Sequence, residues 1–138
     1  MKLILLFLLV LLGMAFAYVR LAPLPQSRLT AKPGPNEPGR HVMLGGVKVV
    51  VPLADLVETP LQTLTEIALA TPRTTQIGTD PLAFVTRSRL WGFPDIATTW
   101  EADGNLHIYS HLIFGKGDLG VNAAKVDAWL APLTRNAQ

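Results

Sequence analysis

The chain opens with an apolar run, and only beyond it do apolar and polar positions alternate. From Leu3 to Val19 no side chain carries a charge, and Lys2 and Arg20 flank the run. As an α-helix the run would be about 25 Å long, at the short end of what a bilayer core of roughly 30 Å accepts. We therefore predict one N-terminal apolar helix, residues 1–20, that is a signal anchor or a signal peptide.

Two interpretations of this helix are open. Ala15 and Ala17 form a small-residue pattern, and cleavage after Ala17 would release a secreted periplasmic protein. Tyr18 and Arg20 instead suit an uncleaved anchor, as an aromatic and a cationic side chain at the membrane interface. We favour the anchor, and we expect a protein of the inner (cytoplasmic) membrane whose C-terminal domain faces the periplasm.

Residues 21–40 show no apolar periodicity and are rich in proline and glycine, at Pro23, Pro25, Pro33, Gly34, Pro35, Pro38 and Gly39. This composition predicts an extended linker that holds the following domain off the membrane surface. We assign a folded domain to residues 41–138.

Strand-like patterns dominate this domain. The β-branched segment Val47–Val51 ends at Pro52, which predicts a strand at a sheet edge. Three further strand-like runs are separated by short turns, one of which is the hairpin signal Asp103-Gly104: 83–91, 96–101 and 106–114. In the last run, apolar residues alternate with His107, Tyr109 and His111, which gives one apolar and one mixed face.

Two helices are predicted beside these strands. Thr59, Pro60 and Gln62 have the form of a capping box, and a helix should follow to about Ala70. A second helix should begin after Asp118, as its N-cap, and end near Ala131, before Pro132. The predicted fold is α+β: an antiparallel β-meander of three to five strands packed against two helices, preceded by the apolar helix.

Composition excludes several classes of function. The formal charge is only +2 and no Lys/Arg run occurs, so we expect no nucleic-acid partner. The chain has no cysteine, which excludes thiol catalysis, disulfides and cysteine-ligated metals. His107 and His111 would lie about 13 Å apart on a strand, too far to share one ion, so we expect no metal site and no cofactor.

The segment from Gly115 to Gly120 formally matches the dinucleotide fingerprint G-x-G-x-x-G. That fold also needs a further parallel strand and an acidic residue about 20 positions on, and neither stands before Gln138. Asp118 would repel a pyrophosphate at the helix N-terminus. We therefore expect no nucleotide, and predict a strand-to-helix joint in which glycines allow the turn and Asp118 caps the helix. Its residues are Gly115, Gly117, Asp118, Gly120 and Asn122, with Asn122 directed back toward the sheet.

The mixed sheet face is the candidate binding surface. If Arg87 and Arg89 meet Tyr109 and His111 of another strand, two guanidinium groups and two further donors could bind a carboxylate or a phosphate headgroup. In the alternative, this face is solvated, and the arginines are paired with Asp95 and Asp118.

Two separated motifs, Arg87-Ser-Arg-Leu-Trp-Gly-Phe-Pro-Asp95 and the segment 115–122, resemble the family of domains of unknown function 1499 (DUF1499). The resemblance covers roughly residues 53–133, and together with the exit 18–23 it implies an alphaproteobacterial, membrane-anchored envelope protein. Many members have serine at position 117, arginine at positions 111 and 125, and a cysteine-containing entry segment. The family implies no reaction.

We therefore expect a non-enzymatic binding or structural role at the envelope, with an anionic ligand or lipid headgroup bound by Arg87, Arg89, Tyr109 and His111. The alternative is a small hydrolase or lyase that pairs His111 with Asp95 or Asp118. The protein or lipid partner itself is not identified by the sequence.

Overall fold

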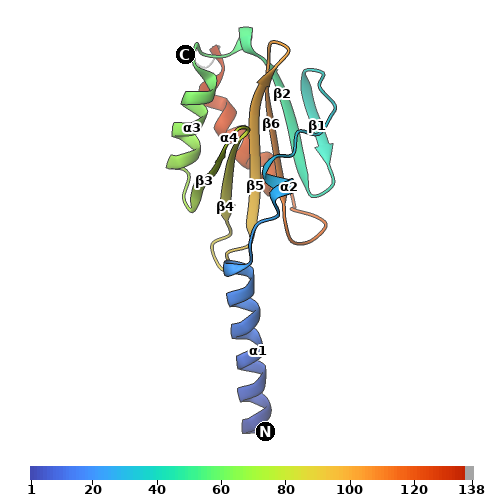
Figure 1. Ribbon diagram of the computed structural model, residues 1–138, viewed down its shortest axis with the longest axis vertical. Coiled ribbons are helices and arrows are strands. Elements are labelled where there is room, and N and C mark those ends of the chain that lie inside the picture. The colour runs from blue at the N-terminus through green and yellow to red at the C-terminus, as the bar shows by residue number, and fades with distance from the viewer. Residues whose placement is uncertain (136–138) are drawn as a thin grey trace.

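The computed structural model describes residues 1–135 and shows a long apolar helix leading into an α+β domain (Figure 1). The helix, α1 (Lys2–Leu21), has no buried residue. Within the described residues it alone is long and apolar enough to cross a membrane, a property that a signal sequence shares. The predicted N-terminal apolar helix is therefore present.

The domain contains six strands and a few helices. In chain order they are α2 (Gln26–Leu29), β1 (Gly39–Met43), β2 (Gly46–Pro52), η1 (Leu53–Asp55), α3 (Pro60–Ala70), β3 (Thr74–Thr79), β4 (Leu82–Arg87), β5 (Pro94–Ala102), β6 (Asn105–Leu112), α4 (Val121–Leu130) and η2 (Ala131–Leu133).

All six strands form one antiparallel sheet in the order β1-β2-β6-β5-β4-β3. The prediction of three to five strands was wrong because β1 lies at the end of the Pro-rich stretch and β3 has a largely polar sequence. Both are edge strands, which can expose one side and need no strong apolar pattern. The strand predicted at 47–51 is β2, an inner strand, because β1 pairs with its free edge.

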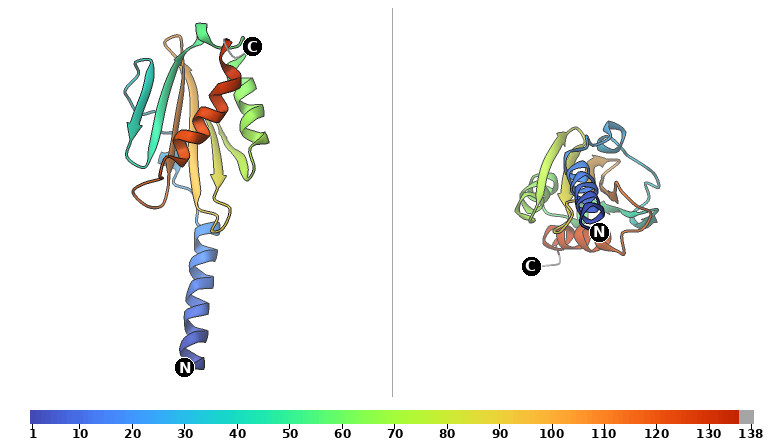
Figure 2. Two further views of the ribbon diagram at one scale, coloured as in Figure 1. Left: turned by 180° about the vertical axis from the view of Figure 1, so that it is seen from behind. Right: turned by 90° about the horizontal axis from the view of Figure 1, so that it is seen from below.

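The helices α3 and α4 cover one face of the sheet, as the view from behind in Figure 2 shows. Leu106 and Ile108 of β6 point to this side and are fully buried with Val126 of α4. The rings of Phe84 and Trp129 meet edge to face, with centroids 5.8 Å apart. This core holds the strand-to-helix joint and the β4–β5 loop in fixed positions.

The opposite face of the sheet is covered by residues 22–38, which we call the strap. Figure 1 shows its short helix α2 in front of β5. The hydroxyl of Thr98 donates a 2.9 Å hydrogen bond to the carbonyl of Ala31. Lys48 donates to the Asn36 side chain at 3.0 Å and to the Pro33 carbonyl. The strap is therefore packed rather than an extended tether, because polar side chains on this face bind its backbone carbonyls.

Candidate functional site

Arg87 and Arg89 line a hollow of about 270 Å³ beside the β4–β5 loop. We call it the arginine pocket; its lining residues are Arg20, Arg73, Thr75, Arg87, Ser88, Arg89 and Gly92. No carboxylate is among them, and none of the four arginines forms a salt bridge within residues 1–135. Four guanidinium groups around one hollow are suited to binding an anion.

Backbone carbonyls fix three of these arginines. Arg87 donates to the carbonyl of Gly92 at 2.9 Å, and Arg73 donates through Nε to the carbonyl of Arg87 at 2.9 Å. Arg20 reaches the carbonyl of Leu90 at 3.4 Å. Each guanidinium has five N–H donors, so these bonds orient the groups and leave other donors for a ligand.

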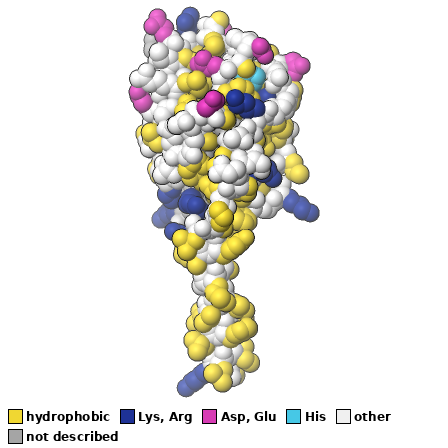
Figure 3. All heavy atoms as spheres, in the orientation of Figure 1, with side chains coloured by type: hydrophobic (Ala, Val, Ile, Leu, Met, Phe, Trp, Pro, Cys, Tyr) yellow, Lys and Arg dark blue, Asp and Glu magenta, His cyan; other side chains and the backbone are white. Residues whose placement is uncertain are grey.

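The pocket lies where α1 meets the domain. Arg87 also approaches the carbonyl of Val19 in the last turn of α1, at 3.4 Å. On the same end of the domain, the rings of Tyr18 and Phe114 lie 6.4 Å apart. In Figure 3, lysine and arginine side chains gather at this junction, directly above the apolar helix.

Tyr109 and His111, the other two predicted ligand residues, do not line this pocket. They lie on β6 and are buried under the strap, at 7% and 1% exposure. Their rings stack with centroids 4.4 Å apart. Burial, with the nearby charges of Arg28 and Lys125, lowers the pKa of His111 to about 4. The structure thus separates the predicted set into two arginines at one end of the sheet and two rings beneath the strap.

The strand-to-helix joint contains a second group of polar side chains. The Asp118 carboxylate accepts hydrogen bonds from the backbone N–H groups of Gly120 at 3.2 Å and Asn122 at 2.9 Å. The Asp118 side chain therefore binds N–H groups at the start of α4, but the N-cap residue is Gly120, so the prediction of Asp118 as N-cap was wrong. Gly120 has a φ of 80°, in the left-handed region that favours glycine. Asn122 is fully buried, and its Oδ1 accepts a 2.5 Å bond from Ser110 on the sheet.

Asp95 and Lys125 complete this polar group. Burial raises the pKa of Asp95; the charge of Lys125 opposes that shift, and the charge of Asp118 adds to it. Burial lowers the pKa of Lys125 to about 8, against the attraction of the two carboxylates. Within residues 1–135 the Lys125 Nζ has no hydrogen-bond partner. Asp95 and Asp118 also line a shallow hollow of about 190 Å³, together with the neighbouring rings of Phe93 and Phe114.

A histidine–carboxylate pair does not form at these positions. Asp95 is aligned with Leu112 of β6, whereas His111 is aligned with Ile96, so His111 and Asp95 point to opposite faces of the sheet. Asp118 lies on the helix-covered side with Asp95. The described residues also contain no group of three or more His, Cys, Asp or Glu side chains that could hold a metal ion.

A family model described as "Protein of unknown function (DUF1499)" matches residues 50–133, more than half of the chain. The chain belongs to the DUF1499 family. No curated protein and no solved structure matches it. The DUF1499 match includes Arg73, Arg87, Arg89 and the joint, whereas α1, Arg20 and the strap lie outside it.

Sequence reasoning missed two arginines of the pocket and Lys125 of the joint. Arg73 stands in the turn after α3 with a φ of 61°, and nothing in its neighbourhood in the sequence marks it. For Arg20, the sequence indicates only an interfacial cation at the end of the apolar helix. Arg20 lines the pocket only because of the way α1 meets this DUF1499 domain. No local sequence pattern predicts that arrangement.

Proposed function

We propose that this DUF1499 protein is a membrane-anchored envelope protein whose domain binds the anionic phosphate headgroup of a membrane lipid in the arginine pocket. The observation that carries the proposal is the set of four guanidinium groups around one hollow without a carboxylate. Like charges held together repel one another, and a bound anion removes that repulsion. Arginine forks fit phosphate oxygens with two parallel hydrogen bonds.

The place of the pocket supports a lipid rather than a soluble anion as the ligand. It adjoins the last turn of α1, so when α1 crosses a bilayer the pocket lies at the level of the headgroups. The loops at this end also expose apolar side chains: Leu90 is 77% exposed and Leu119 is 100% exposed. Such side chains can enter the membrane–water interface while the arginines bind anionic lipid. The attraction of a basic residue to an anionic membrane surface is about 1 kcal/mol.

We infer that α1 remains attached as an anchor and that the domain faces the periplasm. Phe16 packs on Trp91 with ring centroids 6.0 Å apart, so cleavage after Ala17 would remove a contact between helix and domain. The intact mass of the protein purified from membranes tests this, since cleavage would remove residues 1–17. Protease added outside spheroplasts should then digest the domain; protection from the protease would reverse the orientation.

Lipid binding to the full chain in detergent tests the headgroup site. We expect phosphatidylglycerol to bind more tightly than phosphatidylcholine, and the preference to weaken as salt is added. The double variant Arg73→Gln/Arg89→Gln should lose the preference. Arg40→Gln is the matched control, because Arg40 is paired with Asp127 and lies outside the pocket. Equal binding of the two lipids by the native chain, or an equal loss in the control, would refute the headgroup site.

A further inference from the structure

We propose that the lipid bound in the arginine pocket lays one acyl chain in an apolar groove between α1 and the β4–β5 loop. This inference rests on the proposed function and specifies its ligand as an amphiphile, a phosphate headgroup with an attached hydrocarbon chain. The groove has a volume of about 380 Å³ and is lined by Leu9, Leu12, Gly13, Phe16, Leu90 and Trp91.

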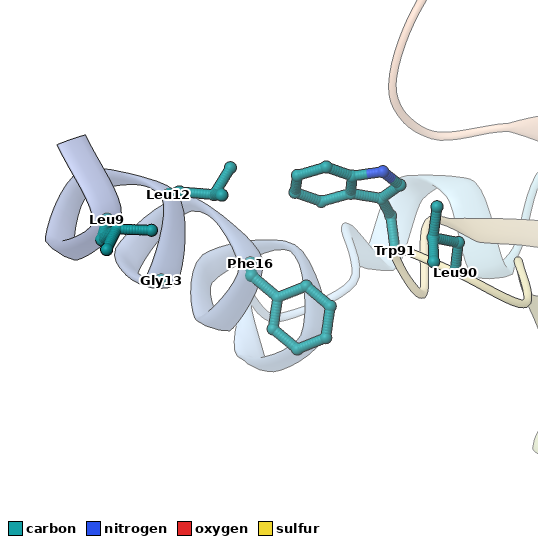
Figure 4. Close-up of a pocket in the computed structure, with 6 residues that line it drawn as sticks. All are labelled: Leu9, Leu12, Gly13, Phe16, Leu90 and Trp91. Carbon is teal, nitrogen blue, oxygen red and sulfur yellow. The ribbon is translucent and has the colours of Figure 1, made fainter. Parts of the chain in front are cut away.

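The groove is built from one face of a helix and one loop. Leu9, Leu12, Gly13 and Phe16 are spaced by three and four residues, so they share a face of α1. Figure 4 shows the Trp91 indole extending from its loop toward this face, beside Leu12 and Phe16. Apart from Gly13 itself, its two chain neighbours and the nearby helix backbone, no atom lies within 4 Å of the place where a Cβ of Gly13 would stand, so the floor of the groove is open. A lining of this kind fits hydrocarbon and offers a polar ligand almost no partner.

The residues that line the groove are next to residues that line the arginine pocket, both in the β4–β5 loop and in α1. In the loop, Arg89 and Gly92 line the pocket, and the two residues between them, Leu90 and Trp91, line the groove. In α1, Phe16 lines the groove and Arg20, about 6 Å further along the helix axis, lines the pocket. The Arg20 guanidinium lies 4.3 Å from the centre of the Phe16 ring. A lipid whose phosphate lies among the arginines therefore has the groove close by for one acyl chain.

Charge complementarity favours a lipid over a second copy of α1. Gly13 could permit close packing of two helices, as small residues do in membranes. A second copy, however, would bring its own four arginines beside the first four, whereas a lipid phosphate brings the opposite charge. The lipid is therefore the occupant we assign, and the helix dimer becomes an outcome of the test.

Quenching of Trp91 by brominated acyl chains tests the groove in the full chain reconstituted into vesicles. Trp100 and Trp129 are 9% and 2% exposed within the domain, so the quenched signal comes from Trp91, and Trp91→Phe checks this. Vesicles contain phosphatidylcholine and phosphatidylglycerol at fixed mole fractions, with bromine on one lipid or the other. We expect brominated phosphatidylglycerol to quench more than its mole fraction predicts. Gly13→Leu, which fills the groove, should abolish that excess, whereas Ala15→Leu, outside the groove, should keep it.

The possible outcomes separate the groove from the headgroup site. If the native chain prefers phosphatidylglycerol in detergent but both brominated lipids quench Trp91 in proportion to mole fraction, the groove is refuted and the headgroup site stands. If the preference is absent in detergent as well, both are refuted. The chain has no cysteine, so oxidation of Gly13→Cys gives a covalent dimer where two helices meet at this face. Efficient formation of this dimer in the same phosphatidylcholine and phosphatidylglycerol vesicles would refute the acyl chain as the occupant of the groove and assign the groove to a second copy of α1.

Discussion

The hydroxyl of Ser110 donates a 2.5 Å hydrogen bond to the side-chain oxygen of Asn122, and both residues are fully buried. This bond attaches the first turn of α4 to β6 in the middle of the sheet. On this face of β6 the side chains next to Ser110, Ile108 and Leu112, are apolar. A buried polar pair of this kind is stabilising only while both partners are present.

Truncation of Asn122 should therefore cost more than loss of one hydrogen bond. We expect Asn122→Ala to lower the free energy of unfolding by about 1–3 kcal/mol, because it leaves the Ser110 hydroxyl buried without its partner. The double variant Ser110→Ala/Asn122→Ala should be less destabilised than the sum of the two single variants. Chemical denaturation of all four proteins measures this coupling. Additive losses would show that the pair does not act as a unit.

The Asp118 cap gives a second prediction. Asp118→Ala removes the acceptor for two backbone N–H groups and should lower the free energy of unfolding by about 1 kcal/mol. Burial opposes the charged carboxylate, but the hydrogen bonds from Asn122 and Gly120 outweigh it and lower the pKa of Asp118. Because the pKa of Asp118 is lower in the folded chain than in the unfolded chain, its carboxylate stabilises the fold at pH values above the ordinary carboxyl pKa. This contribution is lost as the pH falls through the pKa of the folded chain. Unchanged thermal stability with loss of cellular function would instead make Asp118 a functional residue.

The packing of the strap is tested by two neighbouring threonines of β5. Thr98→Val removes the bond to the Ala31 carbonyl and should cost about 1 kcal/mol. It should also speed tryptic cleavage after Arg28, which the strap carries. Thr99→Val is the matched control, because the Thr99 hydroxyl is buried without a partner in the described residues. Equal cleavage of both variants and the native chain would mean that residues 22–38 are an extended tether after all.

The His111 prediction concerns pH. Its pKa is lowered to about 4, so between the ordinary value near 6.5 and about 4 the unfolded chain binds a proton that the folded chain does not. Stability should therefore fall as the pH falls through this window, and His111 should contribute no slope above it. Arg28 and Lys125 add to the effect, since both oppose a second positive charge. The difference between the native and His111→Gln unfolding curves isolates it, and a pH-independent difference would contradict the prediction.

Alternation along a strand predicted the faces of β6, and short turns predicted the antiparallel order. His107, Tyr109 and His111 do share one face, opposite to Leu106 and Ile108, because the register of β6 follows the period of two. The covering of that face could not be predicted. The strap has no periodicity, and it is bound through backbone carbonyls that any residue provides.

Of the candidate site, the sequence predicted Arg87 and Arg89. Alternation extends the predicted strand to Trp91, but the strand ends at Arg87, because Ser88 and Phe93 close a turn through the Ser88 N–H and the Phe93 carbonyl. Arg89 consequently lies in a loop near α1 rather than on a strand facing β6. Which distant arginines join it depends on tertiary packing.

Lys125 offers the last prediction, at the joint between Asp95 and Asp118. Because its charge lowers the pKa of Asp95, Lys125→Met should raise the pKa of Asp95 further, as a carbon-detected NMR titration of the carboxyl group would show.

The same substitution, Lys125→Met, also removes the titration of the Lys125 amine from the folding equilibrium. The Lys125 pKa of about 8 lies below its ordinary value, so between about 8 and 10.5 the unfolded chain holds the extra proton and stability rises with pH. Lys125→Met should lose that rise, whereas substitution of Lys116, an exposed lysine in the loop before α4, by Met should keep it. Identical pH curves for Lys125→Met and the native chain would show that Lys125 is not held as a buried cation beside Asp95.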